Sequence, residues 1–192
     1  MNEVKSDLMP LLDIFGTNKY RTILIDPPWD IKFDLPWGQG KKKQYDTMTL
    51  EEIRNMPIST LAADECDLFL WTTQTYLPMA FDLLKAWNFK YHITLTWDKG
   101  SGLSMFGFYR RTEFCIYAYK GKIGIEKEGQ TIPTKIEEIP DLFMERTKFH
   151  SRKPQILYKY IEAKTKEPRL ELFARSKRTG WDVWGNQVPN NV

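Results

Sequence analysis

The sequence contains few of the residues that build disulfide scaffolds and metal centres. Of its 192 residues, two are cysteines and two are histidines. Cys66 and Cys115 lie far apart and show no C-x-x-C spacing, so we expect neither a disulfide framework nor a zinc site. His92 and His150 are the only histidines, and the sequence predicts no other metal cluster.

Long hydrophobic runs and a strong charge of either sign are absent as well. No apolar stretch approaches the ~18 residues of a membrane-spanning helix, and the first residues show no signal-peptide pattern. We therefore expect a cytoplasmic protein with no membrane partner. A formal net charge of +3 permits a nucleic-acid partner without requiring one. No glycine-rich phosphate fingerprint follows a strand, which argues against P-loop and nicotinamide enzymes.

The composition is that of an ordinary globular protein, with 42% hydrophobic and 28% charged residues. The length suits one sizeable core, so we expect a single domain over residues 1–192. Aromatic residues make up 14%, including seven tryptophans. This surplus serves either the core, which is the default, or a stacking surface for bases.

Short apolar runs alternate with segments of helical spacing along the chain. This alternation predicts an α/β domain with a largely parallel sheet and helices on both faces. Residues 1–20 are expected to form a lead-in, residues 100–107 a glycine-rich loop, and residues 30–47 and 121–147 mobile loops. We expect strands at 22–25, 67–72, 91–97, 113–119 and 170–174, an edge piece at 181–184, and helices at about 49–55, 77–87 and 155–163.

The most informative stretch is Asp26-Pro27-Pro28-Trp29, which directly follows the first predicted strand. The prolines carry no N–H, so this stiff turn presents carbonyl oxygens beside a carboxylate and an indole ring. Asp26 and a carbonyl oxygen of the turn would each accept one hydrogen of an amine on a flat ring, while Trp29 stacks on the ring face. From these four residues alone, a strand-ending turn with Trp29 in the core is an equally good interpretation.

Two further residues, Arg175 and Glu171, are expected to lie near this turn. Asp26 and Arg175 each follow a predicted buried strand, and ligands of such sheets bind beyond the carboxyl ends of strands where the strand order reverses. If those strands are neighbours, both side chains face one pocket. Glu171 lies within a buried strand, so it must be paired or must face the edge of that pocket.

Together these motifs resemble the S-adenosyl-L-methionine-dependent adenine-N6 methyltransferases of the mRNA-adenosine-methyltransferase-like family. The resemblance covers roughly residues 20–188 and implies a Rossmann-like class I methyltransferase fold in which the catalytic D-P-P-W precedes the cofactor-binding strand. The blocks that carry it, in family order, are Asp26–Ile31, Leu35–Gly38, Leu68–Trp71, Glu113–Cys115, Lys120-Gly121, His150–Pro154, Glu171–Arg175 and Gly185–Gln187.

The resemblance implies roles for five residues at the cofactor. Asp26 would accept a hydrogen bond from the adenine amine and lie near the methionine part of S-adenosyl-L-methionine. Lys153 would bind the methionine carboxylate at a helix start, where a cation and free amides both favour an anion. Arg175 would contact the ribose. Asn186 and Gln187 would bind the ribose hydroxyls and the cofactor adenine.

The resemblance and the charges also suggest residues that bind the substrate. Trp37 matches a family aromatic in the active-site loop, and Glu113 a family glutamate near the substrate entrance, although such a glutamate often pairs with a nearby arginine. The candidates for phosphate contacts are Lys41, Lys42, Lys43, Arg110 and Arg111, although a lysine run is most often just solvated.

The chain departs from the mRNA enzymes of the family in two ways. After Arg175 it lacks their longer segment with His and Asn, which puts ribose contacts from residues 176–180 in doubt. It also lacks their zinc-finger region and extensions, which favours the compact bacterial and phage members that act on DNA. RNA adenosine as the substrate, a non-catalytic nucleic-acid-binding subunit, and a homodimer stay open.

Overall fold

The computed structural model describes residues 10–30, 47–105, 107–122, 140–146 and 152–188. Seven strands form one sheet in the order β5-β3-β4-β2-β1-β6-β7. β4 is antiparallel to both of its neighbours, and the other four pairings are parallel. The strands are β1 Tyr20–Ile25, β2 Ala62–Thr72, β3 Lys90–Met105, β4 Phe108–Lys120, β5 Leu142–Met144, β6 Arg169–Leu172 and β7 Asp182–Trp184.

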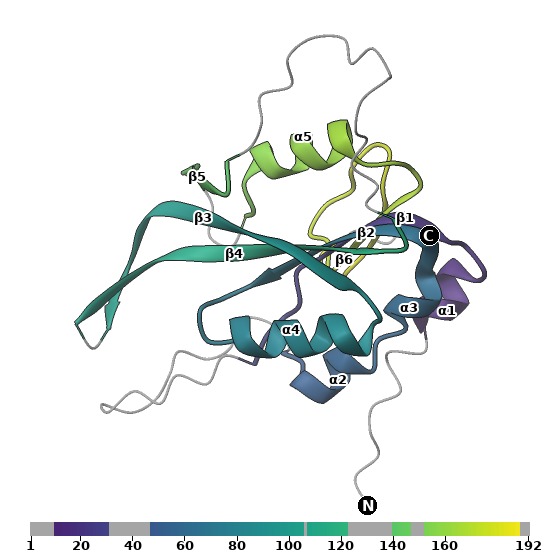
Figure 1. The fold of residues 1–192 in the computed structure, drawn as a ribbon, viewed down its shortest axis with the longest axis horizontal. Helices are drawn as coiled ribbons and strands as arrows, with labels where there is room; N and C mark the ends of the chain where they lie inside the picture. The colour runs from purple at the N-terminus through teal and green to yellow at the C-terminus, as the bar shows by residue number, and fades with distance from the viewer. Residues whose placement is uncertain (1–9, 31–46, 106, 123–139, 147–151, 189–192) are drawn as a thin grey trace, which may run out of the picture.

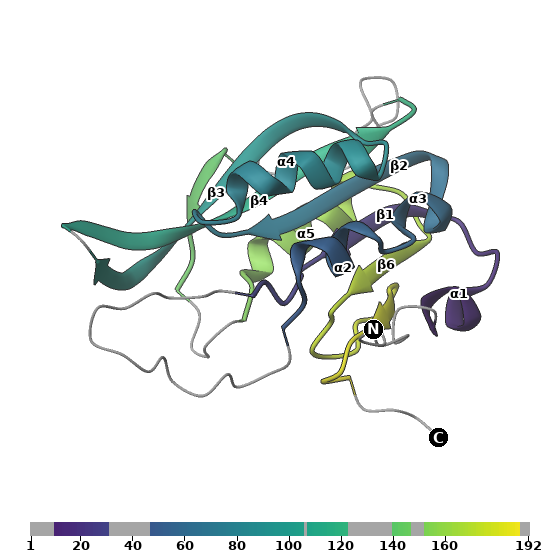
Figure 2. The ribbon, with the colours of Figure 1, turned by 90° about the horizontal axis from the view of Figure 1, so that it is seen from below.

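Helices cover both faces of this sheet. α2, α3 and α4 lie along one face and α5 along the other, as Figure 1 shows, and Figure 2 views the face with α4. The predicted α/β class with a mostly parallel sheet is therefore confirmed. That the chain forms a single domain stays a prediction. The helices are α1 Pro10–Phe15, α2 Leu50–Arg54, α3 Ile58–Leu61, α4 Leu77–Ala86 and α5 Gln155–Lys164.

The alternation of side chains along β1 and β2 explains why these strands are apolar without interruption. Ile23 and Ile25 belong to the core cluster shared with α4, whereas Leu24 between them belongs to the cluster under α5. Phe69 and Trp71 on β2 likewise face α5. Each fully buried side chain of this size contributes about 1.5–3 kcal/mol of hydrophobic free energy.

Helix α2 begins where the sequence predicts. Thr49 accepts a hydrogen bond from the backbone of Glu52 through its side chain, and Glu52 accepts one from the backbone of Thr49. This capping box satisfies two amides at the helix start. Helix α5 begins after Pro154, as expected from a proline that fixes its own φ and leaves no unpaired N–H. The short helix α3 was not predicted.

Three predicted segments differ from the structure. Residues 100–105 continue β3 instead of forming a loop. The backbone of Gly102 lies so close to β4 that a Cβ there would come within 2.1 Å of the Arg110 carbonyl oxygen. Glycine here permits a close strand pairing across a bulge. The strand predicted at 170–174 ends at Leu172, because Phe173 has a φ of 63°.

The expected mobile loop at 121–147 contains a strand in its described part. β5 pairs in parallel with β3, and the Asp141 carbonyl accepts the Thr96 N–H at 2.6 Å. Residues 123–139, and residues 31–46 of the other predicted loop, lie outside the described residues, as do residues 1–9 of the lead-in. Within the described part of the chain, no helix is long and apolar enough to span a membrane.

Candidate active site

The acidic turn lies at the point where the strand order reverses. β1 is flanked by β2 on one side and β6 on the other, and both pairings are parallel. Asp26 therefore follows β1 at the same edge of the sheet where Phe173 begins the turn after β6. The predicted placement of Asp26 and Arg175 beside neighbouring strand ends is confirmed.

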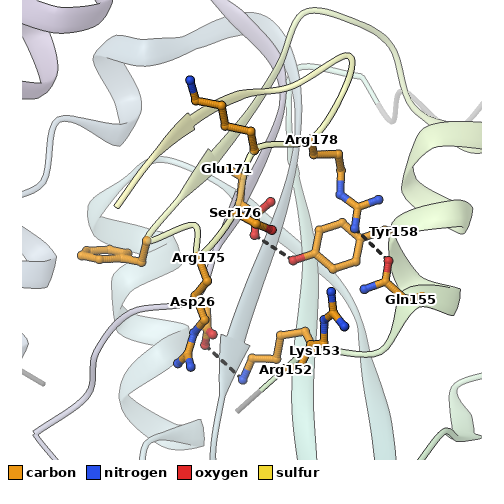
Figure 3. A pocket seen from close by; sticks show the side chains of 11 residues that line it. Asp26, Arg152, Lys153, Gln155, Tyr158, Glu171, Arg175, Ser176 and Arg178 are labelled. Atoms are coloured by element: carbon orange, nitrogen blue, oxygen red, sulfur yellow. Dashed lines mark hydrogen bonds and ion pairs between the residues drawn. The ribbon is translucent and has the colours of Figure 1, made fainter. Parts of the chain in front are cut away.

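A cavity of about 310 Å³ opens at this edge. Its volume lies at the lower end of the roughly 300–1,000 Å³ of small-molecule sites. Four side chains point into it from different elements (Figure 3). Asp26 follows β1, Lys153 precedes α5, Tyr158 lies on α5 and Glu171 lies on β6. The lining residues are Asp26, Arg152, Lys153, Gln155, Tyr158, Glu171, Phe173, Arg175, Ser176, Lys177 and Arg178.

Lys153 joins two carboxylates beside the cavity. Its Nζ lies 3.1 Å from Asp26 Oδ1 and 2.8 Å from Glu113 Oε2. Burial raises the pKa of Asp26, and the Lys153 ammonium only partly opposes this effect. The pKa of Glu113 is lowered, because the ammonium groups of Lys153 and Lys99 outweigh its burial. The two carboxylates raise the pKa of Lys153, against the effect of its burial.

The pairing of Glu113 differs from the arginine pairing weighed from the sequence. Lys99 and Lys153 hold its two oxygens, whereas Arg111 pairs with Asp98. Glu113 thus lies beside Asp26 at the sheet edge where the cavity opens, which we call the active edge. Arg110 is exposed near the turn of the β3–β4 hairpin, away from this cluster.

The start of α5 already holds an anion. Glu145 accepts the backbone N–H of Gln155 at 2.8 Å and that of Ile156 at 3.0 Å. Two of the amides expected to favour the cofactor carboxylate are therefore occupied by a side chain of the protein. Lys153 remains the cation at this position, and its Nζ also lies 4.8 Å from the centroid of the Trp71 ring.

Trp29 is largely a core residue. Its ring stacks on Tyr76 with centroids 4.9 Å apart, and its Nε1 donates to the Trp71 carbonyl at 3.2 Å. Only 6% of its surface is exposed. Tyr76 thus covers one face of the ring that was predicted to stack on a base, and the stacking role stays a prediction.

The carbonyl oxygens of the two prolines already accept backbone hydrogen bonds. The Pro27 carbonyl accepts the Trp29 N–H at 2.8 Å, and the Pro28 carbonyl accepts the Met48 N–H at 2.9 Å. Neither proline is among the residues that line the cavity. A carbonyl oxygen has two lone pairs, so the predicted contact with an amine hydrogen stays a prediction.

The far wall of the cavity is a polar cluster that the sequence did not predict. Tyr158 donates from its hydroxyl to Glu171 at 2.7 Å, so Glu171 is both paired and at the cavity. Burial raises the pKa of Glu171. The Arg178 guanidinium stacks 3.8 Å over the Tyr158 ring and donates to Gln155 at 2.9 Å. The spacing of three residues between Gln155 and Tyr158, which places both on one face of α5, is a sequence signal for this cluster.

The remaining predicted residues divide into two groups. Arg175 lines the cavity, whereas Asn186 and Gln187 are exposed at the same sheet edge, beyond its lining. A side chain at Gly185 would bring its Cβ within 2.2 Å of the Ala174 carbonyl oxygen, so this segment runs tightly against the turn after β6. Trp37, Lys41, Lys42 and Lys43 lie outside the described residues.

The lining residues include five cations and two carboxylates, Asp26 and Glu171. Such a set suits a ligand that carries charges of both signs, because each charge finds a partner on the wall. The described residues contain no group of three potential metal ligands. Lysine and arginine donors do not bind metal ions, so this wall suits an organic ligand.

The fold and the acidic turn at its switch point define a Rossmann-like methyltransferase. The MT-A70 family profile matches residues 20–187. The chain belongs to the MT-A70 family of methyltransferases, which confirms the resemblance inferred from the motifs.

Three relatives illustrate the range of the family. Type II methyltransferase M.MunI of Mycoplasma sp is 30% identical, and the match covers 95% of this chain and 84% of that protein. The N(6)-adenosine-methyltransferase MT-A70-like protein of Arabidopsis thaliana is 29% identical, over 92% of this chain and 24% of its own length. METTL3, the N(6)-adenosine-methyltransferase catalytic subunit of Homo sapiens, is 28% identical, over 92% and 30%. The chain thus spans less than a third of these two longer relatives.

Proposed function

We propose that this protein transfers a methyl group from S-adenosyl-L-methionine to the N6 amine of adenine in DNA. The observation that carries the proposal is Asp26, held by Lys153 at the reversal point of the sheet and facing a cavity of mixed charge. DNA is favoured because the match to Type II methyltransferase M.MunI covers 84% of that protein's length. RNA adenosine is the second candidate, since the adenosine methyltransferases match as well.

The cavity wall fits the charges of the proposed cofactor. Lys153 and Arg175 supply cations for a carboxylate and a ribose, and Asp26 and Glu171 supply anions for an ammonium and a sulfonium. Asn186 and Gln187 would add amide contacts to the ribose hydroxyls and adenine from the adjoining edge. The cofactor supplies an electrophilic methyl group on a sulfonium sulfur.

Asp26 and the proline turn would orient the substrate amine. This amine is a poor nucleophile, because its lone pair is delocalised into the adenine ring. A carboxylate oxygen of Asp26 and a carbonyl oxygen of Pro27 or Pro28 would accept its two hydrogens and favour a pyramidal nitrogen. The protein then contributes positioning and fixed electrostatics, without a covalent enzyme intermediate. The base must leave a duplex, or come from a single strand, to reach this pocket.

The proposal is tested by incubating the protein with isotopically labelled S-adenosyl-L-methionine and DNA or RNA oligonucleotides. Nucleoside mass spectrometry should detect labelled N6-methyldeoxyadenosine from DNA. Labelled N6-methyladenosine from RNA alone would establish the second candidate. Calorimetry of cofactor binding separates both from a non-catalytic subunit, which would bind nucleic acid but produce neither nucleoside.

The pH dependence of turnover should report the environment of Asp26. Asp26 must be ionised to accept an amine hydrogen, and burial raises its pKa above the usual value of about 3.9. When the pH is lowered, activity should therefore begin to fall at a pH above the ordinary pKa of an aspartate. Because Glu113 raises and Lys153 lowers this pKa, Lys153→Met should move the acid limb of kcat to higher pH. A pH profile of kcat that stays in place in this variant would contradict the assignment.

The β3–β4 hairpin offers a contact surface for the DNA strand that carries the target base. β3 runs parallel to β2, so its far end extends beyond the active edge, as Figure 1 shows. Near the turn, Phe108 is 75% and Tyr109 57% exposed, beside the exposed Arg110. Aromatic and arginine side chains together bind single-stranded nucleic acid by stacking and charge.

Replacing all three hairpin residues should therefore weaken DNA binding. We expect Phe108→Ala, Tyr109→Ala and Arg110→Gln combined to raise the KM for DNA about tenfold, with cofactor affinity unchanged. Tyr91→Ala is the matched control, because Tyr91 is 48% exposed at the opposite end of β3. Equal KM values for the two variants would exclude the hairpin from the DNA-binding surface.

A cytoplasmic location and a homodimer belong to the same proposal. Nucleic acid and the cofactor are both found inside the cell, and recognition of a target sequence needs protein surface against the nucleic acid. A second copy of the chain would supply additional surface for that purpose. Sedimentation of the protein with and without DNA measures its oligomeric state.

A further inference from the structure

Lys99 is the outer member of a row of four alternating charges that ends at Asp26. Its Nζ lies 3.1 Å from Glu113 Oε1. The other Glu113 oxygen, Oε2, lies 2.8 Å from the Lys153 ammonium. Lys153 in turn lies 3.1 Å from Asp26 Oδ1. Two lysines and two carboxylates thus balance one another from four places in the fold: β3, β4, the segment before α5 and the turn after β1.

The backbone around Lys99 places it for this contact. The pairing of β3 with β4 shifts between Asp98 and Leu103, which marks a bulge that begins beside Lys99. Asp98 Oδ1 accepts the N–H of Gly100 at 2.8 Å, and Gly100 has a φ of 70°. Bulges redirect side chains next to active sites. Trp97 is the direct cross-strand partner of Glu113, and Lys99 follows it by two residues.

The charge of Lys99 changes how Lys153 is shared. With Lys99 present, each oxygen of Glu113 has its own cation, and Lys153 can lie between Glu113 and Asp26. Without Lys99, Lys153 would be the one cation of this row for both carboxylates, and Glu113, at 2.8 Å against 3.1 Å for Asp26, would draw it away from Asp26. The side chain of Lys99 is 31% exposed, so water replaces it only in part.

We propose that Lys99 is a positioning residue for methyl transfer, which acts through Glu113 and Lys153 to fix the carboxylate of Asp26. This inference rests on the proposed function. It assigns Lys99 no contact with cofactor or DNA. Its loss should therefore lower kcat by more than it weakens cofactor binding, because the Lys153 ammonium stays beside the cavity.

The experiment compares Lys99→Met, Lys99→Arg, Glu113→Gln and the double variant Lys99→Met with Glu113→Gln. We expect Lys99→Met to lower kcat about tenfold, with the Kd for S-adenosyl-L-methionine within about twofold of the wild-type value. Lys99→Arg should recover most of kcat, because it restores the charge. The double variant should be no slower than Glu113→Gln alone, since Lys99 acts through that carboxylate.

Lys85→Met is the matched control. Lys85 also lies 3.1 Å from a carboxylate, that of Asp82, but on the exposed surface of α4. It should leave kcat unchanged. A kcat for Lys99→Met equal to that of this control would overturn the inference, as would a double variant whose losses multiply.

A readout that needs no substrate separates this inference from the proposed function. The ammonium protons of Lys153 should give a resolved signal in ¹H–¹⁵N spectra of the wild-type protein, because two ion pairs slow their exchange. The signal should persist in Lys99→Arg and broaden in Lys99→Met. An unchanged signal in Lys99→Met would overturn the inference. A wild-type protein that methylates neither DNA nor RNA would overturn the proposed function, whereas the Lys153 signal would still show whether Lys99 fixes the row of charges.

Discussion

Replacing Asp26 with alanine should lower the methylation rate by at least ~10²-fold. The variant removes the acceptor that would hold the substrate amine, and the loss of one such preorganised group costs about 10²–10³ in kcat. Among the residues that the structure describes, it also leaves Lys153 with one close carboxylate, that of Glu113, so the position of the ammonium changes as well. Measuring N6-methyldeoxyadenosine at saturating cofactor and DNA gives this number directly.

The fold should survive this change. Asp26 lies after β1, and the core residues Ile23 and Ile25 are untouched. Asp82→Asn on the exposed surface of α4 serves as the control and should keep full activity. If Asp26→Ala retains near-normal turnover, Asp26 has no part in the mechanism.

Replacing Lys153 with methionine should destabilise the protein and weaken cofactor binding. Lys153 is 14% exposed, and its partners Asp26 and Glu113 are 20% and 21% exposed. Removing one member of a buried ion pair costs about 3–5 kcal/mol, because the partners stay behind without compensation. In a chain of this size the Tm should fall by roughly 6–20 °C. The Kd for S-adenosyl-L-methionine should rise about tenfold to a hundredfold, for loss of one charge-assisted contact.

The stability defect should depend on pH in a defined direction. Without the ammonium, the pKa values of Asp26 and Glu113 rise, so both groups bind protons more readily in the folded state. The defect is therefore complete at high pH and shrinks as pH falls and the carboxylates become neutral. Calorimetry at about pH 8 and about pH 5 measures it. Adding Glu113→Gln should restore part of the lost Tm, and an unchanged Tm in Lys153→Met would show that the ammonium is not needed for stability.

The sequence predicts the central strands and the larger helices well, because local patterns decide them. The apolar runs that end at Ile25 and Thr72 are buried on both faces, and the Thr49 capping box fixes the start of α2. Glycines misled the prediction for residues 100–107, since Gly102 serves a close strand pairing and not a loop. The period of a strand does not show where a bulge occurs.

At the active site, the sequence predicts strand ends better than it predicts partners. Asp26, Arg175 and Lys153 meet at one cavity, as their positions after strands and before a helix indicate. The contacts of Trp29 with Tyr76, and of Glu113 with Lys99, depend on side chains far apart along the chain. Such pairs follow from the tertiary fold and leave no short motif in the sequence.

The hydrogen bonds from the start of α5 to Glu145 have a consequence for how this protein can change over evolution. They tie residue 145 to residues 155 and 156, which closes the chain on either side of residues 146–154. Lys153 lies between the two anchor points, so an insertion or deletion near it would displace the ammonium that holds Asp26. Loss of the Glu145 carboxylate would release the same segment from the start of α5, so the site depends on an acidic side chain at residue 145 that does not itself line the cavity.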